Sequence, residues 1–282
     1  MNEVILEALD VFYRYPEGTW ALTGASLAIQ RGQKVAILGP NGAGKSTLFL
    51  HFNGLLRPEK GQIRFHGEVL RYDRSSLWQL RQRVGIVFQD PDTQLFSASV
   101  RQEISFGPLN LGLKPPETQQ RVEAAMAATG ISSLADRPTH FLSHGQKKRV
   151  AIADVLAMEP EVLISDEPTA GLDPVGARRI IDLLTEINAR GTTVVISTHD
   201  VDLAYAWADV AFVMAGGQVI GGGKPEEVFE QDELLVKAEL EKPWLLEVHQ
   251  ALVQGGCSVP PLGRPRRRRE LLQMILAMTP QR

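Results

Sequence analysis

The first third of the chain carries the apolar–polar alternation that is typical of β-strands. Residues 4–9 and 25–29 alternate in this way, and a Pro-Glu-Gly turn at 16–18 lies between them. A short helix is predicted at 77–82. The other apolar runs are short, which favours further strands. These further strands are predicted at 34–38, 61–65, 84–88, 162–165, 192–197, 210–214 and 218–220.

The pattern becomes helical between residues 90 and 160, where prolines interrupt the chain. One helix face is formed at i, i+3, i+4 and i+7 spacing by Val122, Ala125, Met126 and Thr129. A second helix is predicted to start at Ser143 and run through residue 157. A third follows Asp173, with an apolar face made by Ile180, Ile181, Leu183, Leu184 and Ile187. We therefore expect a helical insertion at 90–160 within a mixed α/β core.

From Pro225 the composition shifts toward short helical segments, predicted at 226–230, 233–240, 245–254 and 271–276. We interpret this part as an appended helical region that serves subunit contact or regulation. Six arginines and one glutamate between residues 264 and 282 give it a charge of 6 − 1 = +5. The arginine run 266–269 fits the solvated flank of a helix, an anionic membrane surface or, as a third interpretation, nucleic acid.

The bulk composition narrows the class of protein. The 282 residues suit one large domain or one domain with an appendage, and 44% hydrophobic residues are enough for a full core. The net charge of 30 − 33 = −3 argues against a general nucleic-acid binder. The single cysteine, Cys257, and an N-terminus unlike a signal peptide fit a reducing cytosol. No apolar run approaches the roughly 18 residues needed to span a membrane, so a membrane process would require another chain.

Residues 39–47, Gly-Pro-Asn-Gly-Ala-Gly-Lys-Ser-Thr, match the pattern G-x-x-x-x-G-K-[ST] between a predicted strand and a predicted helix. Glycines let successive backbone N–H groups turn inward toward phosphate oxygens, and the helix N-terminus adds partial positive charge. Lys45 is placed to reach the β- and γ-phosphates, and the Ser46 hydroxyl to bind Mg²⁺. The alternative is an ordinary glycine turn from strand to helix.

Polar residues follow three other predicted strands: Gln89, the pair Asp166 and Glu167, and His199. Open α/β sheets bind ligands at the carboxyl ends of their strands. Asp166 is predicted to hold Mg²⁺ and Glu167 to polarise an attacking water, while Gln89 suits either task. Without a nearby phosphate loop, such residues are usually solvated.

Three more residues have a structural interpretation beside a binding one. Ser143 fits an N-cap, and its Ser-His-Gly-Gln helix start also offers N–H groups and a hydroxyl to a phosphate. Asp173 fits the N-cap of the next helix. Tyr15, in an Arg-Tyr-Pro turn, suits stacking on an adenine ring or covering the edge of a sheet.

Together, these pieces resemble the ATPase domain of the ATP-binding-cassette (ABC) family, from residue 3 to about residue 225. The glycine-rich segment 39–47 is similar to the family's phosphate loop, and Gln89 to its glutamine loop. Residues 142–146, Leu-Ser-His-Gly-Gln, are similar to its signature. Asp166 and Glu167 stand where the family has its magnesium carboxylate and catalytic base.

Three further positions extend the resemblance: Asp173 corresponds to the D-loop, His199 to the switch histidine and Tyr15 to the adenine-stacking aromatic. The implied ligands are ATP and Mg²⁺. The implied catalytic residues are Glu167, His199 and Gln89, and the implied magnesium ligands are Ser46, Gln89 and Asp166. The implied nucleotide-binding residues are Tyr15, Gly39, Asn41, Gly42, Gly44, Lys45, Ser46, Thr47, Ser143, Gly145, Gln146 and Asp173.

The resemblance implies an α/β fold: a P-loop NTPase core with an N-terminal antiparallel β subdomain, a helical insertion and a C-terminal helical appendage. The ATPase domain would cover residues 1–225, with the insertion at about 90–160, and the appendage residues 225–282. The chain departs from the family pattern at His144, which replaces the first glycine of the signature. Asp154 and the arginine run 266–269 also look individual to this chain.

Segments 89–96, 106–113, 143–153 and 167–174 resemble, more finely, the ATPase subunits of energy-coupling-factor importers, above all the cobalt and nickel importer ATPase. This implies an ATP hydrolase at the cytoplasmic face of the cell membrane that powers import of a transition-metal ion, with cobalt favoured. An ATPase of a vitamin importer is the near alternative. A soluble ABC ATPase that acts on nucleic acid or ribosomes is the alternative from another class.

The resemblance also implies partners. Two ATPase chains, either identical copies or two related chains, would face head to tail. Ser143 and Gly145 of one chain would then contact the ATP that Lys45, Ser46 and Asp166 of the other chain hold. A transmembrane coupling subunit and a substrate-binding membrane subunit are expected as well, and no nucleic acid.

Overall fold

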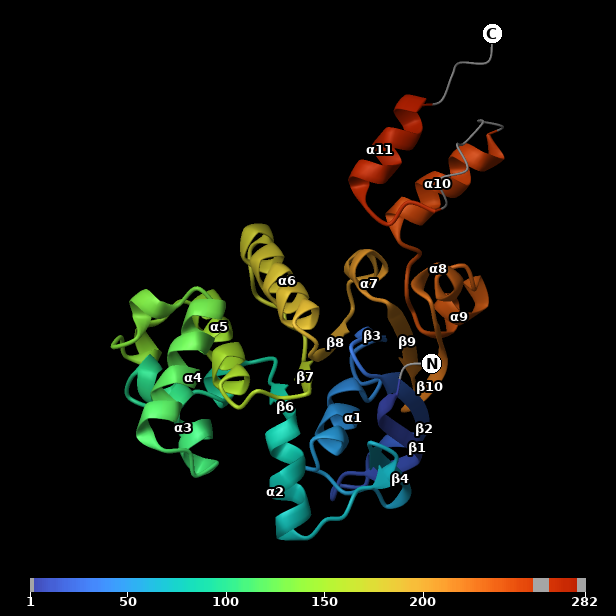
Figure 1. Ribbon diagram of the computed structural model, residues 1–282. Helices are drawn as coiled ribbons and strands as arrows, with labels where there is room; N and C mark the ends of the chain where they lie inside the picture. Colours follow the sequence, from blue (N-terminus) through green and yellow to red (C-terminus); the bar gives the residue numbers. More distant parts are fainter. Residues whose placement is uncertain (1–2, 256–263, 278–282) are drawn as a thin grey trace.

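The alternating N-terminal segments form a four-stranded antiparallel sheet in the computed structural model, which describes residues 3–255 and 264–277 (Figure 1). In spatial order its strands are β2 (Trp20–Gln30), β1 (Val4–Arg14), β4 (Lys60–Phe65) and β5 (Glu68–Val69). β1 and β2 are longer than predicted. The pairing shifts register between Ala8 and Val11, around Asp10 with its φ of 47°, so a bulge interrupts the alternation without ending the strand.

The continuous apolar runs form a second sheet of six strands. Five of them run parallel, and β10 pairs antiparallel with β9 at one edge. Because parallel strands end at the same edge, the segments that follow β3, β7 and β8 lie next to one another. In spatial order the strands are β10 (Gln218–Gly223), β9 (Val210–Ala215), β3 (Lys34–Leu38), β8 (Thr193–Thr198), β7 (Val162–Ser165) and β6 (Val84–Val87).

The central strands β3, β7 and β8 of the six-stranded sheet are covered on both faces, and for this reason they are mostly apolar. On one face Ala36 and Ile196 belong to a hydrophobic cluster with helices α6 (Pro174–Ala189) and α7 (Val201–Trp207). On the other face Val35 and Val195 pack with α1 (Lys45–Phe52) and with the antiparallel sheet. Alternate residues of each strand therefore enter opposite cores.

The insertion is helical, as predicted, and has its own hydrophobic cluster. It is built on α3 (Val100–Asn110), α4 (Pro115–Ala128) and α5 (His144–Leu156), which gather to one side of the sheets (Figure 1). α4 starts six residues before the predicted apolar face at 121–129, because Pro115 fits the first position of a helix. α2 (Arg74–Arg83) precedes the insertion and extends the helix predicted at 77–82. Single turns lie at η1 (Pro91–Thr93), η2 (Ser132–Leu134) and η3 (Thr139–Phe141).

Four helices follow the sheets: α8 (Pro225–Val228), α9 (Asp232–Lys237), α10 (Trp244–Gln254) and α11 (Arg268–Ala277). Leu246 and Leu271 join the same hydrophobic cluster as Tyr205 of α7, so the core continues past residue 225. The N–H group of Trp244 also donates to the Asp202 side chain of α7 at 2.9 Å. The domain boundary at 225 and a role in subunit contact or regulation remain predictions.

The arginines of the run 266–269 differ in burial. Arg266 is partly buried, and its guanidinium donates to the backbone carbonyls of Tyr205, at 2.8 Å, and Ala208. It also lies 3.3 Å from the carboxylate of Glu226. The other three arginines of the run are exposed. Cys257 lies outside the described residues, and none of the helices within 3–255 and 264–277 has the length and apolar character to cross a membrane.

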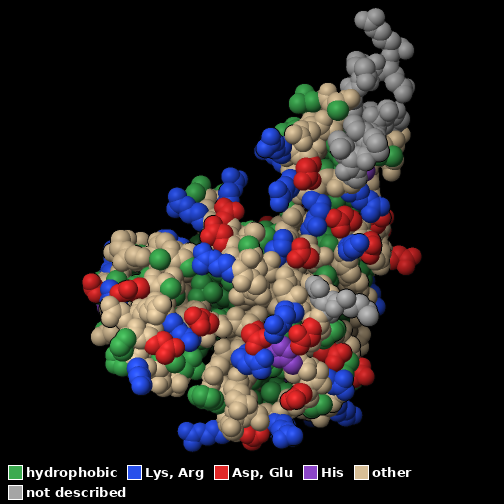
Figure 2. Space-filling view, in the orientation of Figure 1, with side chains coloured by type: hydrophobic (Ala, Val, Ile, Leu, Met, Phe, Trp, Pro, Cys, Tyr) green, Lys and Arg blue, Asp and Glu red, His purple; other side chains and the backbone are tan. Residues whose placement is uncertain are grey.

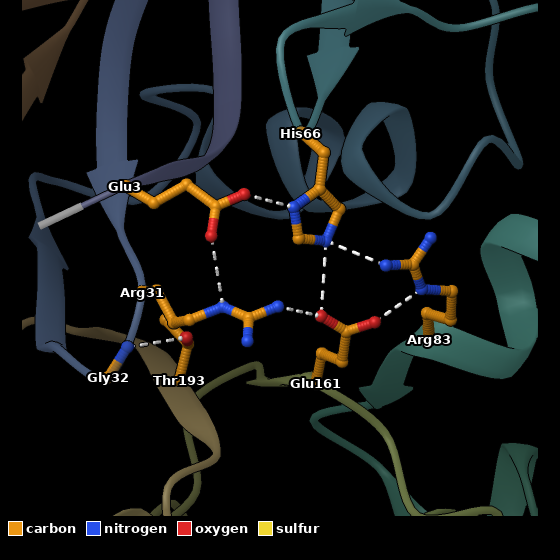
Figure 3. A network of polar contacts seen from close by, with 7 residues as sticks. All are labelled: Glu3, Arg31, Gly32, His66, Arg83, Glu161 and Thr193. Atoms are coloured by element: carbon orange, nitrogen blue, oxygen red, sulfur yellow. Dashed lines mark hydrogen bonds and ion pairs between the residues drawn. The ribbon is translucent and has the colours of Figure 1, made fainter.

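A polar network fastens the two sheets together at the end opposite the strands' carboxyl termini (Figure 3). His66, between β4 and β5, places Nδ1 2.7 Å from Glu3 and Nε2 3.1 Å from Glu161, which precedes β7. Arg31 lies 2.5 Å from the same Glu161 carboxylate, and Arg83 donates to it as well. Burial works to raise the pKa of Glu161, but the Arg83 hydrogen bond and the nearby positive charges outweigh it and lower that pKa.

We expect Glu161→Gln to lower the free energy of unfolding at pH 7 by about 1–3 kcal/mol, because both arginines lose their shared carboxylate. A carboxyl group whose pKa is lowered on folding stabilises the protein above its ordinary pKa, and the contribution disappears as the pH falls through the lowered value. The gap between wild type and variant in urea unfolding should therefore close between about pH 5 and pH 3. Glu68→Gln, at an exposed position of β5, is the matched control. Equal losses in both variants would contradict the prediction.

Candidate nucleotide-binding site

The glycine-rich segment turns the chain from β3 into α1. Gly39, Gly42 and Gly44 all have positive φ, at 148°, 81° and 99°, and Gly44 is the N-cap of α1. A Cβ atom on Gly39 would lie 2.2 Å from the carbonyl oxygen of Met214 on β9. Only glycine fits there, so the turn seats the first N–H groups of α1 against the end of the sheet.

Lys45 is 7% exposed, and its ammonium lies inside the turn. Nζ donates to the carbonyl oxygens of Gly39, at 2.6 Å, and Pro40, at 3.0 Å. Burial lowers the pKa of Lys45, and the charges of Glu167 and Asp166 oppose that shift. The lysine thus places a positive charge between the glycine loop and the two carboxylates.

Asp166 and Glu167 follow β7 and are 7% and 6% exposed. The hydroxyl of Ser197 on β8 donates to Asp166 and accepts the N–H of Glu167 at 2.8 Å. Glu167 has a φ of 44°, which is rare for a residue with a side chain. His199 is exposed, and its Nδ1 lies 3.0 Å from Oε2 of Glu167.

Tyr15 reaches the loop from the turn between β1 and β2. Its hydroxyl lies 3.1 Å from Oγ1 of Thr47, and the ring of Tyr13 packs edge-on at 5.2 Å. The side chain lines the same cavity as the loop. Its stacking on adenine remains a prediction.

One cavity of 480 Å³ collects most of the predicted residues, although their segments lie far apart in the sequence. Its predicted members are Tyr15, Asn41, Gly42, Gly44, Lys45, Ser46, Thr47, Gln89, Asp166, Glu167 and His199. Gly39 does not line the cavity, but its carbonyl oxygen accepts a hydrogen bond from Lys45, which does. The hydroxyl, amide and carboxylate oxygens of Ser46, Gln89 and Asp166 form the type of donor set that Mg²⁺ prefers.

The other four predicted residues lie apart from this cavity. Ser143, Gly145, Gln146 and Asp173 line a second cavity of 460 Å³ between α5 and α6. The interpretation of Ser143 as an N-cap is confirmed: its side chain and that of Gln146 form a reciprocal capping box at the start of α5. Asp173 caps α6 by accepting the N–H of Gly176 at 2.9 Å. The predicted contacts of these residues with a phosphate remain predictions.

Two residues at the site were not among the predicted ones. The sequence predicts Ser197 only as the end of a strand, yet its hydroxyl hydrogen-bonds both Asp166 and the N–H of Glu167. Lys148 of α5 is 3% exposed and donates to the backbone carbonyl of Glu167 at 3.0 Å. Burial lowers the pKa of Lys148 to about 8, and the charges of Glu167 and Asp166 oppose that shift. The sequence signal for Lys148 is its place on the apolar face of the predicted helix, which indicates a buried lysine.

Known proteins are similar to this chain in sequence and in fold. Residues 22–170 match the ABC transporter family. The energy-coupling factor transporter ATP-binding protein EcfA of Methanocaldococcus jannaschii is 52% identical over 239 residues, 85% of this chain and 86% of that protein. The chain belongs to the energy-coupling-factor ABC ATPases. EcfA3 of Clostridium perfringens is also 52% identical to this ATPase, over 86% of each chain.

Solved structures agree with the fold of this ATPase. The structure of cbiO1 from Clostridium perfringens, part of the ABC transporter complex cbiONQ, has a TM-score of 0.76 and 50% identity, covering 89% of this chain and 99% of that one. A dimeric ATP-binding cassette in a post-hydrolysis state, bound to ADP and Pi, has a TM-score of 0.71 at 28% identity, covering 78% and 99%. The predicted P-loop NTPase fold is confirmed, and the chain is an ATP-hydrolysing transport ATPase.

We expect Gly39→Ala to destabilise this ATPase more than Gly42→Ala. Both positions have positive φ, so both variants carry backbone strain, but only the Cβ at residue 39 meets the sheet, while none of the described atoms lies within 4 Å of that at residue 42. Urea unfolding without nucleotide should show losses of about 3 kcal/mol or more and about 1 kcal/mol, respectively. Equal losses would contradict the close contact between Gly39 and β9.

Proposed function

We propose that this ATPase powers import of a transition-metal ion, with cobalt favoured, through a membrane complex at whose cytoplasmic face it lies. The resemblance of segments 89–96 and 106–113 to the cobalt and nickel importer ATPase supports a metal substrate. The likeness to cbiO1, part of the ABC transporter complex cbiONQ, supports a place in a transporter complex. The main support for ATP hydrolysis by this chain is that one cavity brings four side chains together. These are Lys45, Asp166, Glu167 and His199. The alternative is import of a vitamin by the same class of complex, and identifying the ligand of the small membrane subunit distinguishes the two.

In this proposal the loop binds the triphosphate of ATP. The N–H groups at the start of α1 and the Lys45 ammonium stabilise its negative charge. Ser46, Gln89 and Asp166 would hold Mg²⁺, which when bound neutralises charge that develops on the phosphates. Ser197 fixes Asp166 in position through its hydroxyl. Tyr15 would stack on the adenine ring.

Glu167 acts as the general base that accepts a proton from the attacking water. Its Oε2 is buried and, within the described residues, has no hydrogen-bond donor other than the His199 ring nitrogen at 3.0 Å. This leaves the carboxylate able to accept a hydrogen bond from water. His199, exposed beside it, would orient the γ-phosphate and keep Glu167 in place. Gln89 enters the cavity from the end of β6 and would respond to the same phosphate.

The two separate cavities support a composite site. In one chain the signature residues Ser143 and Gly145 lie in a different cavity from Lys45 and Glu167. Two chains facing head to tail would bring the signature of one onto the nucleotide of the other. The cassette bound to ADP and Pi is a relative whose structure is dimeric, which supports a pair of chains. The second chain is either a copy of this one or a related ATPase.

A groove of 690 Å³ between α2 and the insertion is proposed as the docking surface for the transmembrane coupling subunit. The exposed aromatic side chains of Trp78 and Phe106 line it, together with Asp154. Burial raises the pKa of Asp154 to about 7, and the charge of Glu103 adds to the shift. An apolar groove with one buried carboxyl suits an amphipathic helix of a partner.

Gln94 connects this groove to the nucleotide cavity. Its Nε2 lies 3.5 Å from Asp154, and its Oε1 accepts the N–H of Phe88 at 3.2 Å, immediately before Gln89. A displacement in the groove therefore reaches the end of β6 through one side chain. This route would couple movement of the membrane subunit to occupancy of the nucleotide site.

The competing class is a soluble ABC ATPase that acts on nucleic acid or ribosomes. Figure 2 shows Lys and Arg side chains interspersed with Asp and Glu over the visible face, and a binder of polyanions favours a continuous basic surface. Arg266 is engaged with Glu226 and with backbone carbonyls. Both observations favour the transport proposal.

We expect Phe106→Glu to weaken assembly with the membrane subunit by about tenfold or more, because it places a charge in the apolar groove. ATP binding by the isolated chain should stay unchanged. Val236→Glu, at a 78% exposed position of α9 away from the groove, is the control and should assemble normally. Normal assembly of the Phe106 variant would exclude the groove as the docking surface.

We expect Glu167→Gln to keep ATP binding, to lose nearly all turnover and to accumulate as an ATP-bound pair, because the amide cannot accept the proton. ATP hydrolysis and size-exclusion chromatography with MgATP test this. Turnover equal to that of the wild type would remove Glu167 as the base.

The same variant, tagged and captured with MgATP from detergent-solubilised native cells, tests the complex and its substrate. Recovery of a multi-spanning membrane protein together with a small membrane subunit that binds Co²⁺ would support the metal importer. A small subunit that binds a vitamin would replace cobalt by that vitamin. Ribosomal or nucleic-acid-bound proteins that are lost at high salt would overturn the transport proposal.

A further inference from the structure

One face of α5 lies against the segment that follows the proposed catalytic base. His144 and Lys148 are four residues apart, so both side chains leave the helix on the same side. Lys148 reaches the backbone of Glu167, and the His144 ring reaches Ala170 and Gly171. The helix that begins with the signature is therefore in direct contact with the chain from the base to the D-loop.

The contact of Lys148 is buried and directed. The side chain is 3% exposed, and its ammonium donates to the carbonyl oxygen of Glu167 at 3.0 Å. The same carbonyl accepts the N–H of Ala170 at 3.1 Å. A buried ammonium needs such partners, and one hydrogen bond to a carbonyl fixes the orientation of the peptide group.

That peptide group belongs to a strained residue. Glu167 has a φ of 44°, a conformation that persists only where the surroundings hold it. Ser197 holds its N–H from β8, and Lys148 holds its carbonyl from α5. The two ties come from different parts of the fold, the sheet and the helical insertion. Moving α5 relative to the sheet therefore acts on the backbone that aims the Glu167 carboxylate.

His144 adds a second tie four residues earlier on the helix. Its Nε2 lies 3.4 Å from the carbonyl oxygen of Ala170. A Cβ atom on Gly171 would be 3.1 Å from the same ring nitrogen, so the histidine packs closely where the chain has a φ of 73°. The residue that departs from the signature pattern thus contacts the D-loop segment of its own chain.

We propose that Lys148, supported by His144, is a positioning residue that sets the orientation of Glu167 according to the position of α5. The N-terminus of α5 carries Ser143 and Gly145, which in the composite site meet the nucleotide held by the other chain. Closure around that nucleotide moves α5, and Lys148 transmits the movement to Glu167. Each chain thereby aligns its own base only when its signature is engaged. This inference rests on the proposed role of Glu167 as the base.

The test is Lys148→Met in the full chain, which keeps the apolar stem and removes the donor. We expect kcat for ATP hydrolysis to fall about tenfold or more with KM for ATP within about twofold, since an orienting contact acts on the reacting groups and leaves binding of the nucleotide in place. Lys148→Gln offers an amide N–H to the same carbonyl and should recover part of kcat. A purely structural role would lower stability in urea and leave kcat of the folded protein unchanged.

Lys147→Met is the matched control, because its ammonium pairs with Asp92 on η1 and lies on another face of α5. It should keep kcat within about twofold. An equal loss in this control would overturn the proposal, as would a folded Lys148→Met with wild-type kcat. If Lys148→Met does not fold, kcat of Lys148→Gln and of His144→Ala is compared with that of the wild type instead. Both variants should lower kcat at unchanged KM. Wild-type kcat in both would overturn the proposal equally.

Glu167→Gln, measured in parallel, distinguishes a failure of the proposed base from a failure of the proposed positioning role. If it retains turnover, the proposed base is wrong, whatever Lys148 does. If it abolishes turnover while Lys148→Met and Lys148→Gln turn over normally, the base stands and the positioning role alone is excluded.

Discussion

The parallel pairing of β3, β8 and β7 is the constraint on which the site depends. Leu38 pairs with Thr198 across one ladder, and Ser165 with Ile196 across the next, so three strands end almost level. The residues that follow them are the glycine loop, the two carboxylates and His199. No local feature joins these segments in the sequence. The ladder hydrogen bonds and the apolar cores on both faces bring them into one cavity.

The second feature of the site is its balance of buried charge. Lys45, Lys148, Asp166 and Glu167 are all less than 10% exposed. Each ammonium is bound by backbone carbonyls and lies near the carboxylates, which reduces the cost of removing it from water. Replacing one member by an apolar residue therefore removes a charge that offsets the charges of opposite sign around it. A buried site of this kind therefore tolerates few substitutions.

Much of the fold was predictable because the chemistry is local. The pattern of residues 39–47 specifies a turn, a helix start and a lysine within nine positions. Continuous apolar runs predict strands of a sheet that is covered on both faces. The position of Lys148 on an apolar helix face indicates burial, but its contact with Glu167 was not predictable, because the contact crosses 19 positions and depends on how α5 docks. Ser197 was missed for the same reason. The bulge at Asp10 hid half of β1, since it breaks the alternation on which the prediction depended.

The attachment of α10 to α7 has a consequence for how signals reach the site. Trp244 donates to Asp202, only three residues beyond His199, and Arg266 binds the last turn of the same helix. Any molecule that displaces α10 must break the hydrogen bond to α7, the helix that begins two residues after His199. A molecule that displaced α10 and thereby moved His199 would link its own binding to that of nucleotide, and each would then change the affinity of the other by the same factor.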